Sequence, residues 1–425
     1  MKKRVLVYPC GTEIALEVYR ALCFSTHYEI IGGTDSYDHG RFVYKNLIDK
    51  LPFIKDDSDA SDINKFEKAI ADYKIDFIYP AMDGVIAVFA KYRDLFKETL
   101  IIADTDTAEL CRSKKETYTR FKNIIPTPSI YNHPEEVRNY PVFIKPDKGQ
   151  GSVGTKKINN SLELQNVDFE KYVVMEYLPG KEYTVDCFTN ADGKLIYSKA
   201  RGRKRIKNGI SVNAVFNDAP IFSGIAEKIN KELKQKGAWF FQLKEDSNGE
   251  LKLLEIAARI AGTSAISRNI GANLPLMTVD VFNDIKIDDV ALNDYYIELD
   301  RALENVYKTD ITYSTVYIDY DDTVVQEGII NTNVIKFLYQ CINHGIKLIL
   351  LSKHDGDINE ELKKYRINTL FDEVIHINRS DHKVDYIKDN NSIFIDDSYG
   401  ERKAIKEKKG ISVFDTHMIE CLLED

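Results

Sequence analysis

Two carboxylates stand two residues apart at the end of an apolar run near the C-terminus of this chain. Val316–Ile318 has the length and composition of a buried strand, and Asp319 and Asp321 lie at its end. Because alternate residues of a strand point to the same side, both carboxylates can face one metal ion, and Asp319 can attack phosphorus. Clustered like charges are unfavourable in a purely structural role. The pattern predicts a metal-assisted phosphoryl-transfer site.

Later apolar runs also end in polar side chains. In chain order they are Leu348–Leu351 ending in Ser352, then Lys383 after a loop, then Ser392–Ile395 followed by Asp396 and Asp397. This ordered set resembles the haloacid-dehalogenase (HAD) superfamily of phosphatases over residues 314–425. Only 33 positions separate Asp319 from Ser352 and 31 separate Ser352 from Lys383, which leaves no room for a large cap domain. We therefore expect an open site that suits a bulky or protein-tethered phosphate ester.

The HAD resemblance implies a role for each polar residue. Asp319 is expected to be the nucleophile and Asp321 the general acid/base, with the Asp321 carbonyl also at the metal. The remaining roles are phosphoryl binding by Ser352 and Lys383, magnesium ligation by Asp319 and Asp396, and a supporting or alternate metal ligand at Asp397.

A glycine-rich loop lies in the middle of the chain. Phe143–Pro146 reads as a strand that carries Lys145, and the loop Asp147–Thr155 follows with three glycines and two small hydroxyl residues. Backbone amides in such a loop can face phosphate oxygens, and Lys145 can supply a point charge beside them. A β-hairpin turn is the alternative interpretation of this loop taken alone.

Four segments in a fixed order extend this pattern. They are the strand and loop around Lys145, Met175–Gly180, Lys181–Asp186, and the pair Trp239–Gln242 and Leu251–Arg259. The series resembles the ATP-grasp superfamily over residues 1–290, most closely the carbamoyl-phosphate-synthase-like carboxylate–amine ligases. The resemblance implies ATP and Mg²⁺, with Mn²⁺ as an alternative, and a small-molecule carboxylate and amine as substrates.

The ATP-grasp resemblance also implies site residues. Phosphate contacts are expected from Lys114, Lys145, Gly149, Gly151 and Ser152. The adenine hinge is expected at Glu176, Tyr177 and Leu178, the ribose contact at Glu182, magnesium at Gln242 and Glu255, and stabilisation of the transferring phosphoryl group at Arg259. The family usually has an asparagine where this chain has Ala257, so one oxygen ligand for metal is missing.

A basic run, Lys199–Arg205, precedes Asn208-Gly209-Ile210-Ser211. Such runs are commonly solvated surface. In an acidic protein, at the position where related ligases carry a loop over the γ-phosphate, Arg203 and Arg205 are predicted to bind an anionic group. Ser264 and Ser267–Asn269 are further candidates for substrate contact.

Alternation of strand and helix predicts the elements that position these residues. The first hundred residues show strand-length runs at Val5–Pro9, Tyr28–Ile31, Ile75–Pro80 and Leu100–Ala103, and helical patterns at Glu13–Leu22 and Asp62–Tyr73. Alternation of this kind builds a doubly wound parallel sheet. Ala291–Lys308 has no strand pattern and is predicted to be a linker helix.

The predicted class is therefore α/β. A Rossmann-like pre-ATP-grasp domain is expected over 1–110, an α+β ATP-grasp domain over 111–290, a linker over 291–313, and a small capless HAD-like domain over 314–425.

Bulk properties limit the partners. The chain has 425 residues and a net charge of −9, which disfavours nucleic acid and anionic membranes. Its six cysteines are scattered without a C-x-x-C pair, as expected for reduced thiols in the cytoplasm. The apolar stretch behind the basic N-terminus is too short for a signal peptide. Homodimerisation stays open.

Three function classes are compatible with these motifs. The first is a ligase whose attached phosphatase acts on a phosphorylated small molecule that is its substrate or product. The second is a kinase-like ATP-grasp enzyme opposed by the phosphatase. The third is a regulatory module in which the altered metal site leaves ATP as a ligand only.

Overall fold

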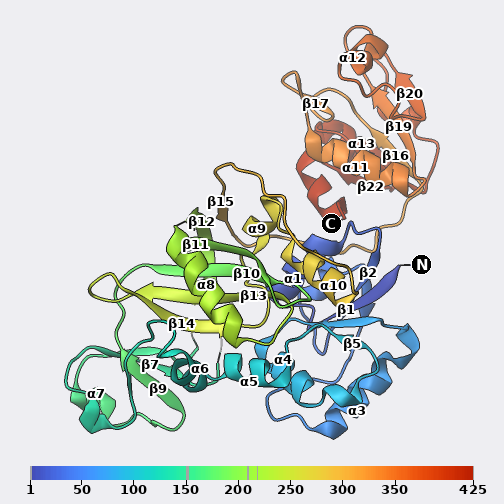
Figure 1. Cartoon of the computed structure of the whole chain (residues 1–425). Helices are drawn as coiled ribbons and strands as arrows, with labels where there is room; N and C mark the ends of the chain where they lie inside the picture. Colours follow the sequence, from blue (N-terminus) through green and yellow to red (C-terminus); the bar gives the residue numbers. More distant parts are fainter. Residues whose placement is uncertain (1, 150–152, 208–209, 218, 425) are drawn as a thin grey trace. The chain divides into compact units, whose positions relative to one another are not determined.

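The computed structural model describes residues 2–149, 153–207, 210–217 and 219–424 (Figure 1). The chain divides into two compact units, Met1–Leu303 (unit 1) and Glu304–Asp425 (unit 2). None of the helices in the described ranges is both long enough and apolar enough to cross a membrane.

Unit 1 begins with a five-stranded parallel sheet of order β3-β2-β1-β4-β5. Its strands are β1 (Lys3–Tyr8), β2 (Tyr28–Gly33), β3 (Asn46–Ile48), β4 (Phe77–Pro80) and β5 (Thr99–Leu100). The helices and 3₁₀ turns of this part are α1 (Glu13–Leu22), α2 (Gly40–Val43), α3 (Ala60–Ile70), η1 (Ala71–Tyr73), α4 (Asp83–Lys91), η2 (Arg93–Leu95) and α5 (Thr105–Arg112).

The central strand β1 is buried on both faces. Val5 and Val7 pack into one apolar cluster, and Leu6 and Tyr8 pack into another. This is the pattern of a parallel strand covered by helices on both sides, so the predicted doubly wound sheet is confirmed. Helix α1 has the predicted bounds because the Thr12 side chain accepts a hydrogen bond from the Ala15 amide and fixes its start.

The rest of unit 1 contains two antiparallel sheets. A four-stranded sheet has the order β6-β9-β7-β8, and a six-stranded sheet has the order β14-β13-β10-β11-β12-β15. The first comprises β6 (Ile130–Tyr131), β7 (Val142–Pro146), β8 (Lys156–Ile158) and β9 (Tyr172–Glu176). The second comprises β10 (Glu182–Thr189), β11 (Leu195–Lys207), β12 (Ile210–Asn217), β13 (Gly237–Glu245), β14 (Leu251–Ala257) and β15 (Glu298–Asp300).

Helices pack against these sheets. They are α6 (Lys114–Phe121), η3 (Pro134–Glu136), α7 (Ser161–Leu164), α8 (Pro220–Glu232), α9 (Ala265–Asn269) and α10 (Leu274–Phe282). Helix α8 contacts β10 and β11, and α10 contacts both β13 and α1 (Figure 1). Helix α10 therefore joins the six-stranded sheet to the N-terminal parallel layer.

The linker helix predicted over 291–308 is wrong. Glu298–Asp300 forms β15, which pairs antiparallel with β12 at the edge of the six-stranded sheet. Charged contacts hold it: Lys204 pairs with Glu298, and Arg205 pairs with Asp300. A strand held by ion pairs shows no apolar periodicity, so the sequence pattern gave no sign of it.

Unit 2 is a second five-stranded parallel sheet, of order β20-β19-β16-β21-β22. Its strands are β16 (Thr315–Ile318), β19 (Lys347–Ser352), β20 (Glu373–His376), β21 (Ser392–Ile395) and β22 (Ser412–Phe414), with a separate hairpin of β17 (Val325–Gln326) and β18 (Ile329–Ile330). The helices are α11 (Thr332–Asn343), α12 (Ile358–Lys364), η4 (Lys383–Tyr386), α13 (Tyr399–Lys409) and η5 (Thr416–Leu422). Between β16 and β19 the chain forms only the small hairpin and α11.

Candidate functional sites

A cavity of about 230 Å³ in unit 1 is lined by residues of both antiparallel sheets. Most of the predicted nucleotide-site residues line it: Lys114, Lys145, Gly149, Tyr177, Leu178, Glu182, Arg203, Gln242 and Glu255. Apolar side chains that the sequence reasoning missed also line it, namely Phe143, Met175 and Leu254. Gly151 and Ser152 lie outside the described residues. The cavity thus combines apolar surface with a charged region.

The two predicted phosphate lysines carry perturbed ammonium groups. Lys145 is only 8% exposed, and its Nζ donates to the Leu254 carbonyl at 3.0 Å. Burial, followed by repulsion from Lys114, lowers the pKa of Lys145 to about 7. Burial also lowers the pKa of Lys114, whose Nζ donates to the carbonyls of Asp147 and Gly149 at 3.2 Å each. An anion in this region would stabilise both positive charges.

Gln242 and Glu255 lie side by side on neighbouring strands. They are register partners across β13 and β14, and both line the cavity. Their oxygens are ligands of the kind that Mg²⁺ prefers. Glu182 is ion-paired with Arg203 and, at 3.5 Å, with Lys244, and Arg203 also donates to Gln242 at 3.2 Å. Arg203 therefore connects the predicted ribose contact with the predicted metal ligands.

Two predicted residues are directed elsewhere. The Glu176 carboxylate accepts from the Ser129 amide at 2.8 Å, and Glu176 does not line the cavity. Arg205 is an exposed residue bonded to both Asp300 oxygens, at 2.8 and 2.9 Å. Its guanidinium thus forms an ion pair that holds β15 to the sheet, and its contact with an anionic substrate stays a prediction.

A second cavity of about 250 Å³ adjoins the first. The two share Arg203, Gln242 and Glu255 as lining residues. The second cavity is also lined by Arg259, by Thr12 and Glu13 at the start of α1, and by Arg201. Loops of the parallel sheet and strands of the antiparallel sheet therefore meet around one space beside the predicted metal ligands.

Arg259 is held by a residue that the sequence reasoning missed. Its guanidinium binds both oxygens of Asp83, the first residue of α4, at 2.5 and 2.6 Å. Burial opposes ionisation of Asp83, but Arg259 outweighs it and holds the pKa of Asp83 below its ordinary value. Asp83, Glu255, Ala257 and Arg259 line a smaller cavity of about 60 Å³, so the unusual alanine does face the site.

The predicted substrate serines do not line either of the larger cavities. Ser267 donates to Asp186 at 3.0 Å, and Asp186 forms a fully buried ion pair with Arg201 at 2.8 Å. Ser264 is buried. The side-chain amide of Asn269 donates to the Ala265 carbonyl within α9. Ser267 therefore supports the Asp186–Arg201 pair, whereas Thr263, close by in the sequence, lines the second cavity.

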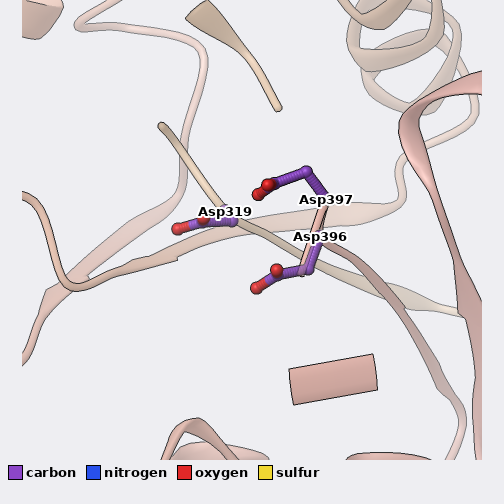
Figure 2. A group of neighbouring side chains, drawn as sticks. All are labelled: Asp319, Asp396 and Asp397. Carbon is purple, nitrogen blue, oxygen red and sulfur yellow. The ribbon is translucent and has the colours of Figure 1, made fainter. Parts of the chain in front are cut away.

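Unit 2 gathers its predicted site at the carboxyl edge of its sheet. Asp319, Ser352 and Asp396 lie at or just after the ends of β16, β19 and β21, which are neighbours in register. Oxygens of Asp319, Asp396 and Asp397 lie within 4.8 Å of one another, and the three carboxylates point the same way (Figure 2). Oxygen atoms so arranged can ligate Mg²⁺.

Lys383 is the cation among these acids. Its Nζ lies 2.7 Å from Asp319 Oδ1 and 2.6 Å from Asp396 Oδ2, and the residue is buried. Burial and the charge of Asp319 raise the pKa of Asp396 to about 7, and burial raises the pKa of Asp319 although Lys383 opposes it. Three carboxylates thus lie close together with one lysine ammonium group paired to two of them, an arrangement that a divalent cation would stabilise.

Other contacts in unit 2 were not anticipated. Arg402 donates to the carbonyls of Asp396 and Asp397 at 2.6 Å each and fixes the loop after β21. The Asp397 amide donates to the Thr323 hydroxyl at 3.0 Å. Asp321 is absent from the carboxylate cluster and is bonded instead to His354 at 2.9 Å. The sequence places His354 two residues after Ser352, which was the available signal.

Solved structures share the fold of most of this chain. The biotin carboxylase domain of the Hydrogenobacter thermophilus 2-oxoglutarate carboxylase has a TM-score of 0.57 and 16% identity, covering 69% of this chain and 73% of its own. Biotin carboxylase of Campylobacter jejuni has a TM-score of 0.55 and 16% identity, and the match covers 69% of this chain and 74% of its own. N5-carboxyaminoimidazole synthetase of Staphylococcus aureus, complexed with ADP, has a TM-score of 0.55 and 16% identity, and the match covers 69% of this chain and 81% of its own. At these identities the likeness shows the fold alone.

A family model matches part of unit 1. Residues 168–300 match the family described as ATP-grasp in the biosynthetic pathway with Ter operon. No curated protein matches the sequence. The family match and the shared fold together support the ATP-grasp superfamily for unit 1.

Proposed function

We propose that unit 1 is an ADP-forming ligase that joins a small-molecule carboxylate to an amine through an acyl phosphate. The observation that carries this proposal is the pair of adjoining cavities that share Arg203, Gln242 and Glu255. One has the apolar and cationic surfaces that a nucleoside triphosphate needs. The other is lined by arginines and lies where a second substrate could meet the terminal phosphate.

The residues of the first cavity fit ATP with Mg²⁺. The apolar side chains suit the adenine ring, Lys114 and Lys145 suit phosphate oxygens, and Glu182 suits the ribose. Gln242 and Glu255 would hold the metal, which would supply charge neutralisation at the terminal phosphates. Four of the similar structures are described as complexes with ADP, ATP or β-γ-ATP, in one case as the magnesium salt, which supports the same assignment.

The second cavity is the proposed acceptor site. A carboxylate held beside Arg259 and Arg203 would attack the γ-phosphorus, and ADP would leave as the acyl phosphate forms. An amine would then attack the acyl carbon and release inorganic phosphate. Asp83 would keep the Arg259 guanidinium oriented toward the transferring group.

Unit 2 is proposed to be a capless HAD-type phosphatase. The supporting observation is the Asp319, Asp396 and Asp397 cluster with Lys383 at the carboxyl edge of a parallel sheet. Asp319 would attack phosphorus to give an aspartyl phosphate while the alcohol leaves with a proton from Asp321. Water would then hydrolyse the acyl phosphate, with Asp321 accepting its proton.

The finer domain assignments belong to this proposal as well. Residues 1–110 would be a Rossmann-like pre-ATP-grasp domain, 111–290 the ATP-grasp domain, and 314–425 the HAD-like domain. The Hydrogenobacter relative is described as a dimer, so a homodimer is included in the proposal.

ADP release in the presence of paired carboxylates and amines tests the ligase. We expect ADP only when both substrates are present, together with an amide product. ADP formed with one substrate and a phosphorylated product would support a kinase. Bound ATP without any ADP release would support a regulatory module, the alternative that Ala257 in the cavity favours.

A further inference from the structure

His354 contacts two separate parts of the proposed phosphatase site. Its Nδ1 lies 2.9 Å from Asp321 Oδ1 and 3.1 Å from Asp321 Oδ2, on the loop after β16. Its backbone amide donates to the Ser352 hydroxyl at 3.2 Å, at the end of β19. When Asp321 is ionised, Nδ1 must carry the proton of the first contact, because a carboxylate only accepts. When Asp321 is protonated, its unprotonated oxygen can still accept from Nδ1.

The His354 ring and backbone are themselves fixed. The ring packs edge-on against Tyr320, with centroids 5.1 Å apart, and the side chain is 16% exposed. The His354 carbonyl lies 2.8 Å from His376 Nε2, at the end of β20. The Asp321 side chain is 51% exposed, so its position depends on few other contacts.

The direction of this contact matters because Asp321 follows Asp319, a member of the carboxylate cluster, by only two residues. Asp319, Asp396 and Asp397 have oxygens within 4.8 Å of one another, and Asp321 is not among them. A carboxylate that serves as general acid and base must face the leaving oxygen and the attacking water. A carboxylate that joined the cluster could not do so.

We propose that His354 is a positioning residue that holds the Asp321 carboxylate outside the metal-ligand cluster and directed at the leaving group. The proposal rests on the proposed phosphatase function of unit 2. The imidazole donates one hydrogen bond throughout and takes no proton from substrate. Asp321 gives its proton to the departing alkoxide as the Asp319–phosphorus bond forms and the ester bond breaks, and regains one from water in the second step.

Leaving-group dependence separates positioning from a general structural role. An aryl phosphate releases a stabilised phenolate, whereas an alkyl phosphate releases an alkoxide that needs a proton. His354→Leu should therefore lower kcat/KM at least tenfold more for an alkyl phosphate than for an aryl phosphate. His354→Asn places an amide N–H near the position of Nδ1 and should recover most of the loss. His344→Leu, which removes another histidine–carboxylate pair of the same unit, is the matched control.

Each outcome decides the proposal. Equal loss on both esters, or no loss, overturns it. A leaving-group-dependent loss that asparagine does not restore also overturns it, because the imidazole would then be exchanging protons itself. Wild-type protein that hydrolyses neither ester refutes the phosphatase assignment instead. In that case the contact is still tested by the ¹⁵Nδ1 resonance of His354, which must shift in Asp321→Ala if the hydrogen bond exists in solution.

Discussion

Replacing Lys145 by methionine removes a buried ammonium group and keeps most of the side-chain volume. Burial lowers the pKa of Lys145 from 10.5 to about 7, so the empty site charges this lysine only partly at neutral pH. Binding of the triphosphate must therefore be coupled to protonation of Lys145 before the full ammonium–phosphate hydrogen bond can form. Loss of one charge-assisted hydrogen bond costs about 2–3 kcal/mol, which is a rise of roughly 30- to 150-fold in the Kd for ATP.

The pH dependence follows from the same group. Below pH 7 Lys145 is protonated before ATP arrives, and above pH 7 each unit costs about 1.4 kcal/mol to protonate it. Wild-type Kd should therefore rise up to about tenfold per unit above pH 7, with proton uptake on binding, and Lys145→Met should lack this uptake. Isothermal titration calorimetry in two buffers of different ionisation enthalpy measures both quantities.

The free energy of unfolding of Lys145→Met shows whether weaker ATP binding comes from a misfolded variant. The folded-state pKa of Lys145 is depressed, so the cost of burying its charge is fully present below pH 7 and is lost as pH rises toward 10.5. Ligand-free Lys145→Met should then be at least as stable as wild type at pH 7. Lys115→Met is the control, because Lys115 donates to the Phe169 and Glu170 carbonyls and does not line the cavity. Unchanged ATP affinity and unchanged proton uptake in Lys145→Met would refute the assignment.

Three further outcomes are expected. Glu255→Ala should abolish ADP formation and leave aryl phosphate hydrolysis intact, since Glu255 lies in unit 1; loss of both activities in folded protein would contradict two independent sites. Asp83→Asn should lower kcat for ADP formation about tenfold with little change in the KM for ATP, because Arg259 loses its charged partner; an unchanged kcat would show that the Arg259–Asp83 pair is not used. Asp319→Asn should reduce phosphatase turnover to background and prevent beryllium fluoride from binding; residual turnover free of contaminating phosphatase would exclude Asp319 as nucleophile.

Local patterns were sufficient for the parallel layers and for most of the residues that line the proposed nucleotide cavity. Val5–Tyr8 is apolar at every position because both of its faces are covered, and a short run of this kind is legible in the sequence. Lys145 and the Glu255 strand were found because each lies within a contiguous motif. Gln242 and Glu255 were then placed together by strand pairing.

Contacts between distant segments could not be predicted from the sequence. Arg259 meets Asp83 across 176 positions, and no spacing rule links them. Arg205 was predicted to bind an anionic group because its basic run lies in an acidic protein where related ligases carry a loop over the γ-phosphate. The sequence did not show that β15 supplies Asp300 as a partner. His354 is only two residues from Ser352, yet its importance depends on where the Asp321 side chain turns. Rotamers and long-range ion pairs of this kind are set by the folded packing.

Transfer of ¹⁸O is the most direct test of the ligase claim. The Asp319→Asn chain, in which hydrolysis by unit 2 is removed, would be supplied with ATP, an amine and a carboxylate labelled with ¹⁸O. An acyl phosphate intermediate requires that one labelled oxygen appear in inorganic phosphate for each amide formed, and mass spectrometry of the phosphate measures it. Amide formation with unlabelled phosphate would contradict the acyl phosphate, and the central claim with it.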